Sequence, residues 1–148
     1  RGLGDVYKRQ VAKYASKIMK NGGSFLTLTY VGSNKTTPNY NVMGVAKAAL
    51  ETSVKYLSVD LGKKNIRVNA ISAGPMKTIA GAAISGARHV YRYSEKIAPL
   101  QKNPDLEQVG NAALYLLSNI SSGVTGLTHY VDGGLRVVGI PNQDMVNI

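Results

Sequence analysis

The sequence predicts an α/β fold in which parallel strands are covered by helices. Segments 24–31, 66–72 and 127–131 are short and rich in β-branched, aromatic and other apolar residues, which is typical of strands. Segment 40–61, between the first two, has apolar residues at helical spacing. A helix of this length between two strands makes a βαβ unit, so the strands should be parallel with a right-handed crossover. Ligands bind such sheets at the carboxyl ends of the strands.

Composition limits the possible functions. The chain has 148 residues, of which 44% are hydrophobic, as expected for one globular domain. It has no cysteine, which excludes disulfides, thiolate nucleophiles and cysteine zinc sites. The net charge of +10 favours an anionic ligand or an acidic partner, but no helix-turn-helix, zinc-finger or RNP pattern supports nucleic acid. No apolar run approaches the ~20 residues of a membrane span, and no signal peptide is evident, so we expect a cytoplasmic protein.

The N-terminal segment divides into two parts. Residues 1–10 begin without methionine and show no clear apolar periodicity, so we interpret them as a non-native lead outside the fold. Residues 11–20 have helical spacing and end at Asn21-Gly22-Gly23, which predicts the last turns of a helix. The expected buried face of this helix consists of Val11, Ala15 and Ile18 or Met19.

The helix over 40–61 is the longest that the sequence predicts. Gly62 is expected to end it in a left-handed conformation. Its first turns contain small residues, which allow another backbone to approach closely, either within the chain or at a contact between subunits. These small residues are Gly44, Ala46, Ala48 and Ala49, and the expected buried positions are Met43, Leu50, Val54, Leu57 and Leu61.

The second half of the chain alternates irregular and helical segments. Residues 76–100 are long for a plain connection and predict a partly helical lid or binding loop. A further helix should follow, with Asn103 as its cap, Pro104 in its first turn, and Asp105 and Glu107 near its positive end. Its expected buried face is Val109, Ala113, Leu116 and Leu117.

The remaining polar residues have structural interpretations. Asp132, before Gly133 and Gly134, is expected to stabilise the turn that ends the third strand. Glu51 and Asp60 are interpreted as surface charges rather than as an acid/base pair. His89 and His129 are forty residues apart without metal-ligand spacing, so no metal site is expected.

Tyr30, Tyr40 and Lys47 are the candidates for chemistry. Tyr30 ends the first strand, and Tyr40 opens the helix in which Lys47 follows about two turns and ~10 Å of rise later, on nearly the same face. This spacing suits two groups that hold one extended ligand. A nearby ammonium lowers the pKa of a tyrosine, which is ordinarily near 10. By itself the Tyr-x6-Lys spacing is weak, because such residues are commonly solvated.

Four motifs, GGSFLTLTYVG, PNYNVMGVAKAALE, NIRVNAISAGPMKT and the late VDGG, resemble the short-chain dehydrogenase/reductase superfamily. More narrowly, residues 11 to about 137 resemble the bacterial-type enoyl-acyl-carrier-protein reductases of fatty-acid synthesis. Most of the superfamily has Tyr-x3-Lys, which would require a lysine at position 44. This chain has Gly44 there and Lys47 three residues later, which is the enoyl reductase spacing.

The resemblance implies hydride transfer from NADH, with NADPH possible, to the β-carbon of a trans-2-enoyl thioester. Tyr40 would hydrogen-bond the thioester carbonyl, Lys47 would hold the nicotinamide ribose, and Tyr30 would line the acyl pocket. The other residues implied are Gly74, Pro75, Met76 and Thr78 for the cofactor, and Met43, Ile84 and Arg88 for the substrate.

The resemblance also implies partners. Arg88 and Arg92 are interpreted either as contacts for the acidic acyl carrier protein or as solvated surface residues. The family suggests a homotetramer. Position 87 is alanine where a bulky aromatic is often found, so acyl-chain preference does not follow from the resemblance.

The resemblance places residues 11–148 in the C-terminal portion of a Rossmann-like, doubly wound sheet. A dinucleotide site needs a glycine-rich turn that follows a strand and opens a helix, whereas Gly22-Gly23 ends a helix and precedes a strand. We therefore expect the N-terminal dinucleotide-binding half to be absent and the isolated chain to be inactive. Two alternatives stay open: a short-chain ketoreductase or alcohol dehydrogenase with unusual spacing, and a non-catalytic scaffold that retains the fold.

Overall fold

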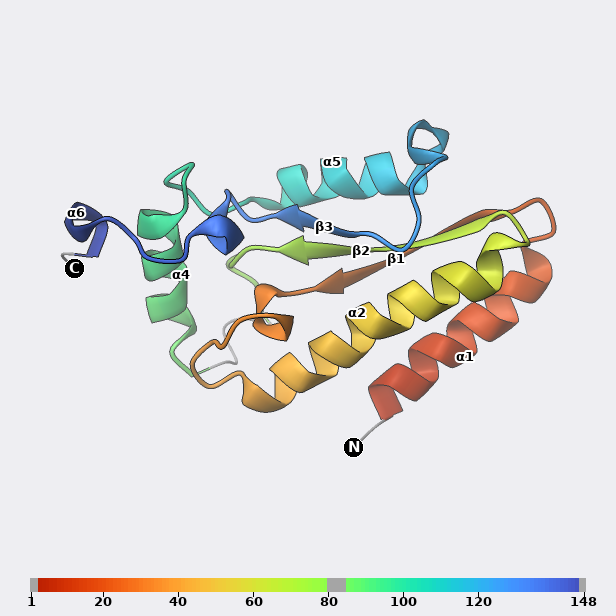
Figure 1. The fold of residues 1–148 in the computed structure, drawn as a ribbon, viewed down its shortest axis with the longest axis horizontal. Coiled ribbons are helices and arrows are strands. Elements are labelled where there is room, and N and C mark those ends of the chain that lie inside the picture. The colour runs from red at the N-terminus through yellow and green to blue at the C-terminus, as the bar shows by residue number, and fades with distance from the viewer. Residues whose placement is uncertain (1–2, 80–84, 147–148) are drawn as a thin grey trace.

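The computed structural model describes residues 3–79 and 85–146. Its centre is a three-stranded parallel sheet of order β1-β2-β3. Helices α1 and α2 lie on one face of the sheet and α5 on the other, and the carboxyl ends of the strands point toward α4 (Figure 1). The predicted α/β fold with a parallel sheet between helices is confirmed. The strands are β1 (Gly23–Thr29), β2 (Ile66–Ala73) and β3 (Thr128–Val131).

Two clusters of buried apolar side chains hold the layers together. On one face, Val54 and Leu61 of α2 (Asn41–Gly62) pack with Ile66 and Val68 of β2. On the other face, Leu116 of α5 and its neighbours pack against the opposite side of β2. Because β2 is covered on both faces, its residues are almost all buried. The second cluster consists of Ile71, Ala73, Val109 and Leu116.

The register of β1 on β2 fixes where the site forms. Pairing runs from Gly23 opposite Ile66 to Thr29 opposite Ser72. The strand expected over 24–31 therefore ends at Thr29, so that Tyr30 is the first residue beyond the sheet. The chain then turns through the short 3₁₀ helix η1 (Val31–Ser33) before α2 begins.

Helix α1 (Leu3–Ile18) differs from its prediction in length and in orientation. It begins within the segment that we interpreted as a lead, not at Val11. Its buried residues are Ala12 and Ser16, whereas Val11 and Ile18 are 61% and 80% exposed. The expected apolar face was therefore wrong for Val11 and Ile18 but not for the other two residues: Ala15 is half-buried, and Met19, just beyond the helix, packs against the core formed by α2 and β2.

The end of α2 also differs. Gly62 is still helical and does not take the left-handed conformation that was expected. Asn65 takes it instead, with φ of 57°. Asparagine is one of the few residues that adopts this conformation readily, so the left-handed residue lies three positions later than predicted, directly before β2. The carbonyl of Asn65 then accepts the Gly23 N–H at 3.1 Å, which fixes the start of β1 beside β2.

Helix α5 (Leu106–Leu117) begins two residues later than Asn103 would place it. Asp105 is its cap and forms a capping box with Gln108. Asn103 instead donates its amide to the carbonyl of Tyr91 at 2.8 Å. Of the expected buried face, Val109 and Leu116 are buried, Ala113 is half-buried and Leu117 is 50% exposed.

The segment after β2 is partly helical, as predicted, with α4 at Ala87–Ile97. Asp132 stabilises the turn after β3, as expected: its two carboxylate oxygens accept the N–H groups of Gly134 and Arg136. The tail, which has no clear sequence pattern, contains short helical turns. The remaining short elements are η2 (Asn119–Ser121), η3 (Leu135–Val137) and α6 (Gln143–Val146).

Candidate active site

The site is built where β1 ends and α2 begins. Tyr30 follows β1 directly, and Tyr40 is the residue that precedes the first turn of α2. Their rings meet edge to face, with centroids 5.1 Å apart and planes inclined by 69°. Two tyrosines that the sequence separates by a polar loop are therefore in contact, as expected if they share one site.

Glycines allow the turn to pass close to both rings. A Cβ at Gly32 would lie 2.6 Å from the Tyr40 ring and 3.3 Å from the Tyr30 ring. A Cβ at Gly44 would lie 2.6 Å from the carbonyl oxygen of Gly32. Any side chain at position 44 would thus collide with the turn. This is a physical reason why the chain has no lysine four residues after Tyr40.

Lys47 lies two turns further along α2 and reaches back to β1. Its Nζ donates a hydrogen bond of 3.0 Å to the carbonyl oxygen of Leu28. Lys47 is half-buried, and this hydrogen bond places its ammonium at the carboxyl end of β1. The three candidate residues therefore surround the same end of β1.

Burial raises the pKa of both tyrosines. Tyr40 is only 8% exposed, and loss of solvent raises the pKa of its phenol above the ordinary value near 10. For Tyr30, burial is the main cause of the raised pKa; a hydrogen bond with the Thr37 side chain opposes it and the neighbouring Tyr40 adds to it. A nearby ammonium would lower the pKa of a tyrosine, but for Tyr40 burial determines the direction, which is upward. Both phenols are thus protonated near neutral pH and able to donate hydrogen bonds.

Glu51 contradicts its prediction as a surface charge. It is 8% exposed, and its Oε1 accepts hydrogen bonds from the hydroxyls of Thr29 at 2.8 Å and Ser33 at 2.6 Å. Its Oε2 accepts from the Asn34 amide at 3.3 Å. The sequence did contain a signal for this burial, since Glu51 shares the helical face of Leu50 and Val54, and both of those residues are buried.

The residues expected near the nicotinamide lie at the end of β2. Gly74 donates its N–H to the carbonyl of Val131 at 2.8 Å, and a Cβ there would approach Pro104 and Asp132 to about 3 Å. Gly74 is therefore required by close packing against its neighbours, whatever its part in ligand binding. Beyond it, Pro75 and Met76 are half-buried and Thr78 is exposed. Ile84, expected to contact substrate, lies outside the described residues.

A cavity of about 820 Å³ opens between the end of β2 and α4. Its lining is cationic, because it includes Lys77, Arg88 and Arg92 against one carboxylate, Glu95. These donors suit phosphate oxygens. The ammonium of Lys77 lies 5.1 Å from the ring centroid of Tyr91, which also lines the cavity.

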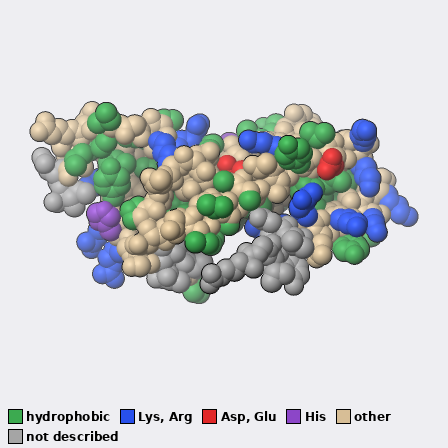
Figure 2. Space-filling view, turned by 60° about the horizontal axis from the view of Figure 1, so that its bottom comes forward, with side chains coloured by type: hydrophobic (Ala, Val, Ile, Leu, Met, Phe, Trp, Pro, Cys, Tyr) green, Lys and Arg blue, Asp and Glu red, His purple; other side chains and the backbone are tan. Residues whose placement is uncertain are grey.

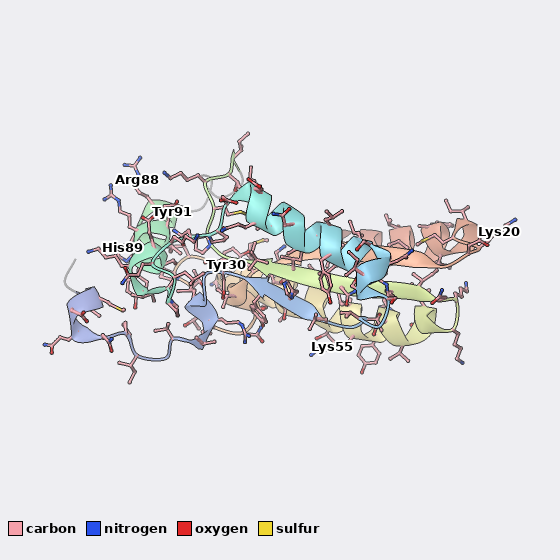
Figure 3. The ribbon with its side chains drawn as sticks, turned by 90° about the horizontal axis from the view of Figure 1, so that it is seen from above. Lys20, Tyr30, Lys55, Arg88, His89 and Tyr91 are labelled. Atoms are coloured by element: carbon pink, nitrogen blue, oxygen red, sulfur yellow. The ribbon has the colours of Figure 1, made fainter. Side chains whose placement is uncertain are left out.

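A second cavity, of about 740 Å³, is lined by Tyr30 together with residues of α4 and of the segment after β3. Figure 3 shows Tyr30 between the sheet and α4, with Arg88 pointing away from the fold at the outer side of α4. Met43 was expected to be buried on α2 and to contact the substrate, but it is 46% exposed and lines neither of these two cavities. The apolar and aromatic lining of the second cavity comprises Tyr30, Val31, Pro38, Val90, Tyr93, Ile97, Leu135, Val138 and Pro141.

The two histidines have aromatic neighbours. His89 stacks on Tyr93 at 6.3 Å between centroids, and His129 lies 6.4 Å from the Tyr115 ring. Within residues 3–79 and 85–146, no cluster of three or more His, Cys, Asp or Glu residues is suited to a metal ion. In the same residues, no helix combines the length and apolarity of a membrane span. On the face shown in Figure 2, Lys and Arg side chains are far more prominent than Asp and Glu.

Comparison with known proteins gives a consistent result. Residues 9–136 match the model of the family described as enoyl-(acyl carrier protein) reductase. Over 138 residues the chain is 56% identical to enoyl-[acyl-carrier-protein] reductase [NADH] 1 of Rhizobium meliloti. The aligned region covers 93% of this chain and 51% of that protein. The corresponding FabI reductase [NADH] of Rickettsia typhi is 55% identical, over 88% of this chain and 50% of the relative. The chain spans about half the length of these curated relatives.

Solved structures show the same fold. The crystal structure of FabI from Candidatus Liberibacter asiaticus has a TM-score of 0.88 and 51% identity, covering 90% of this chain and 52% of that one. The reductase of Anaplasma phagocytophilum, solved in complex with NAD, has a TM-score of 0.85 and 55% identity, covering 89% and 50%.

Proposed function

The chain belongs to the enoyl-(acyl carrier protein) reductase family, and on this basis we propose that the full-length protein reduces trans-2-enoyl thioesters in fatty-acid biosynthesis. The observation that supports this most directly is the contact between Tyr30 and Tyr40 above a glycine turn, with Lys47 at the same end of β1. NADH is the proposed cofactor, since the relatives named above are NADH enzymes and one related structure contains NAD. When bound, it supplies the hydride that is delivered to the β-carbon of the substrate.

Tyr40 is proposed to stabilise the charge that develops on the thioester carbonyl. Burial keeps its phenol protonated, so the hydroxyl is available as a donor. A fixed donor directed at a developing oxyanion is worth more in a buried site than in water. The ring contact with Tyr30 and the close approach of Gly32 restrict the movement of this hydroxyl.

Lys47 is proposed to hold the nicotinamide ribose. Its ammonium lies at the carboxyl end of β1, the edge where ligands of parallel sheets bind. Tyr30 is proposed to line the acyl pocket, and the 740 Å³ cavity that it lines offers apolar volume for an acyl chain. Met43 and Ile84 remain proposed substrate contacts on the family resemblance alone.

The residues at the end of β2 fit a dinucleotide. Pro75 follows the sheet, and Met76 and Thr78 line the cationic cavity beyond it, where Lys77, Arg88 and Arg92 provide donors for phosphate oxygens. Together with Gly74, they are proposed to pass along the nicotinamide end of the cofactor. The Gly22-Gly23 pair precedes β1 instead of following a strand, so it cannot form a dinucleotide turn. We therefore propose that the isolated 148-residue chain binds NADH weakly and is inactive.

Two protein partners are proposed. The exposed Arg88 and Arg92 on α4 suit an acyl carrier protein, which is acidic. A second copy of the chain suits the outer face of α2, where Val42, Val45 and Val59 are each more than 70% exposed. The small residues on this helix divide between two roles: Gly44 is buried against the turn, whereas Ala46 and Ala49 are exposed on the outer face. A homotetramer in the cytoplasm is the proposed assembly, with no nucleic-acid or membrane partner.

One comparison tests the proposed reaction. The full-length protein is assayed with NADH and either crotonyl thioester or acetoacetyl thioester. Faster oxidation of NADH with the crotonyl substrate supports enoyl reduction. Preference for acetoacetyl thioester would establish a ketoreductase, and no turnover of either would favour a scaffold. Fluorescence titration of the 148-residue chain with NADH tests the separate proposal of weak binding, which micromolar affinity would contradict.

A further inference from the structure

We propose that Glu51 is a positioning residue that fixes Tyr30 and, through the adjoining turn, Tyr40. This proposal deepens the proposed function and rests on it for its catalytic consequence. It assigns no direct contact with substrate or cofactor to Glu51. The evidence is a buried carboxylate whose hydrogen-bond donors come from the segment that surrounds Tyr30.

The donors to Glu51 bracket Tyr30 in the sequence. Thr29 immediately precedes Tyr30, and Ser33 follows it by three residues; both hydroxyls donate to Oε1, at 2.8 and 2.6 Å. Asn34 donates to Oε2 at 3.3 Å. The carboxylate thus ties both ends of the η1 turn to α2, and the backbone at Tyr30 has little freedom to shift.

The same turn reaches Tyr40 through Gly32. Space at Gly32 is limited by the Tyr40 ring on one side, and the Gly32 carbonyl lies against Gly44 on the other. If the turn moved away from α2, both the ring contact of 5.1 Å and the packing on Gly32 would be lost. Anchoring the turn therefore fixes both phenols.

Lys47 and Glu51 act on consecutive residues of β1 from consecutive turns of α2. The Lys47 ammonium binds the carbonyl of Leu28, and the Glu51 carboxylate binds the hydroxyl of Thr29. Residues four apart on a helix lie on one face, which places both anchors at the same end of the strand. The end of β1 is thus held from α2 at two successive positions.

The network continues to the third strand. The Asn34 amide also lies 3.3 Å from the Tyr130 hydroxyl, and the Arg136 guanidinium lies 4.2 Å from the Tyr130 ring centroid. The adjacent Lys35 donates to the carbonyls of Arg136 and Val138, at 2.6 and 3.1 Å. Through these contacts the turn that contains Tyr30 is joined both to α2 and to the segment after β3.

A carboxylate suits this site better than an amide. Thr29, Ser33 and Asn34 all act as donors to Glu51, and an ionised carboxylate only accepts. In Glu51→Gln, the Oε1 acceptor is retained, but an amide donor replaces the oxygen that faces the Asn34 amide. We therefore expect Glu51→Gln to fold while the turn loses one of its ties.

The test compares Glu51→Gln with Glu107→Gln in the full-length protein. Glu107 undergoes the same chemical change at an exposed position on α5, so it controls for loss of a charge. Three properties are measured: kcat and KM with crotonyl thioester and NADH, the unfolding temperature, and the NMR signals of the Tyr30 and Tyr40 rings. A ring in edge-to-face contact shifts the signals of its neighbour, so these signals report the geometry of the pair without depending on turnover.

For Glu51→Gln we expect displaced Tyr30 and Tyr40 signals, a kcat lowered between about tenfold and 100-fold, and a KM for NADH close to that of the wild type. Wild-type ring signals in Glu51→Gln would overturn the proposal. If the wild-type protein is active, an unchanged kcat in Glu51→Gln, or an equal effect of Glu107→Gln, would also overturn it. If the wild type does not reduce enoyl thioesters, the proposed function fails, and the ring signals alone decide the role of Glu51. Glu51→Asp, which keeps the charge but shortens the side chain, should restore the signals in part.

Discussion

The rings of Tyr30 and Tyr40 meet edge to face, with centroids 5.1 Å apart. This geometry is favourable for aromatic pairs, because the positive ring edge faces the negative ring face. Each ring also restricts access of water to the other, which contributes to the burial that raises both pKa values. The pair is therefore a protonated, restrained unit at the carboxyl end of β1.

Removal of the Tyr40 hydroxyl tests its role as a donor. In Tyr40→Phe the ring still packs on Gly32, so we expect an unchanged fold and a kcat lowered roughly 10²–10³-fold, as for loss of one oxyanion donor. Steady-state assays of the full-length protein with crotonyl thioester measure this loss. Tyr115→Phe, a tyrosine on α5 away from the site, should match the wild type; a similar loss there, or none in Tyr40→Phe, would contradict the assigned role.

Lys47 should affect the cofactor more than the acyl substrate. We expect Lys47→Met to raise the KM for NADH about tenfold, the effect of losing one charge-assisted hydrogen bond. The KM for crotonyl thioester should change less. Lys55→Met, at an exposed position two turns further along α2, is the matched control (Figure 3). Equal effects of the two variants would show that general charge, not the position of Lys47, determines cofactor affinity.

High pH should destabilise the fold through the two tyrosines. Their pKa values are raised in the folded state, so folded tyrosines bind protons more tightly than unfolded ones. This stabilisation is complete below pH about 10 and is lost as the pH rises toward the folded pKa. Denaturant unfolding across this range should show a falling free energy of unfolding, with a shallower fall in Tyr30→Phe. The same slope in Tyr30→Phe and in the exposed control Tyr56→Phe would refute this.

Association through α2 is tested by placing charge on its outer face. Val45 is 73% exposed, so Val45→Lys should leave the protomer folded but weaken the proposed helix contact between copies. Sedimentation of the full-length protein should then show a smaller assembly. A control, Val137→Lys, changes a residue that is 66% exposed in η3, outside α2. An unchanged assembly in Val45→Lys would remove α2 from the interface.

The sequence predicted the strands and α2 because their patterns are local. Spacing of apolar residues determines which face of α2 is buried, and the βαβ order determines that β1 and β2 are parallel. Helical spacing places Glu51 beside the buried face of α2, but its hydrogen-bond donors come from a turn about twenty residues earlier in the chain, which local pattern does not describe. The left-handed residue after α2 is Asn65 rather than Gly62, and this likewise depends on a contact with the start of β1, where the Asn65 carbonyl accepts the Gly23 N–H.

The sequence identified the candidate residues of the site, but not the direction in which their pKa values are shifted. Tyr30, Tyr40 and Lys47 were identified from spacing and resemblance, and the structure brings them to the same strand end. The raised pKa of both tyrosines did not follow from the sequence, because the extent of burial depends on tertiary packing. The lack of a lysine at position 44 is visible in the sequence, but its cause, the carbonyl of Gly32, is visible only in three dimensions.

The close approach at Gly44 leads to a prediction about stability. A Cβ at this position would lie 2.6 Å from the backbone oxygen of Gly32, and backbone cannot move aside as a flexible side chain can. Although alanine favours helices, we expect Gly44→Ala to lower the free energy of unfolding by about 1–3 kcal/mol, the usual cost of overpacking. A Cβ at Gly110, also within a helix, would meet no described atom within 4 Å, so Gly110→Ala should stabilise by about 0.5–1 kcal/mol. Denaturant unfolding of both variants measures the difference, and stabilisation by Gly44→Ala would show that the turn is free to move.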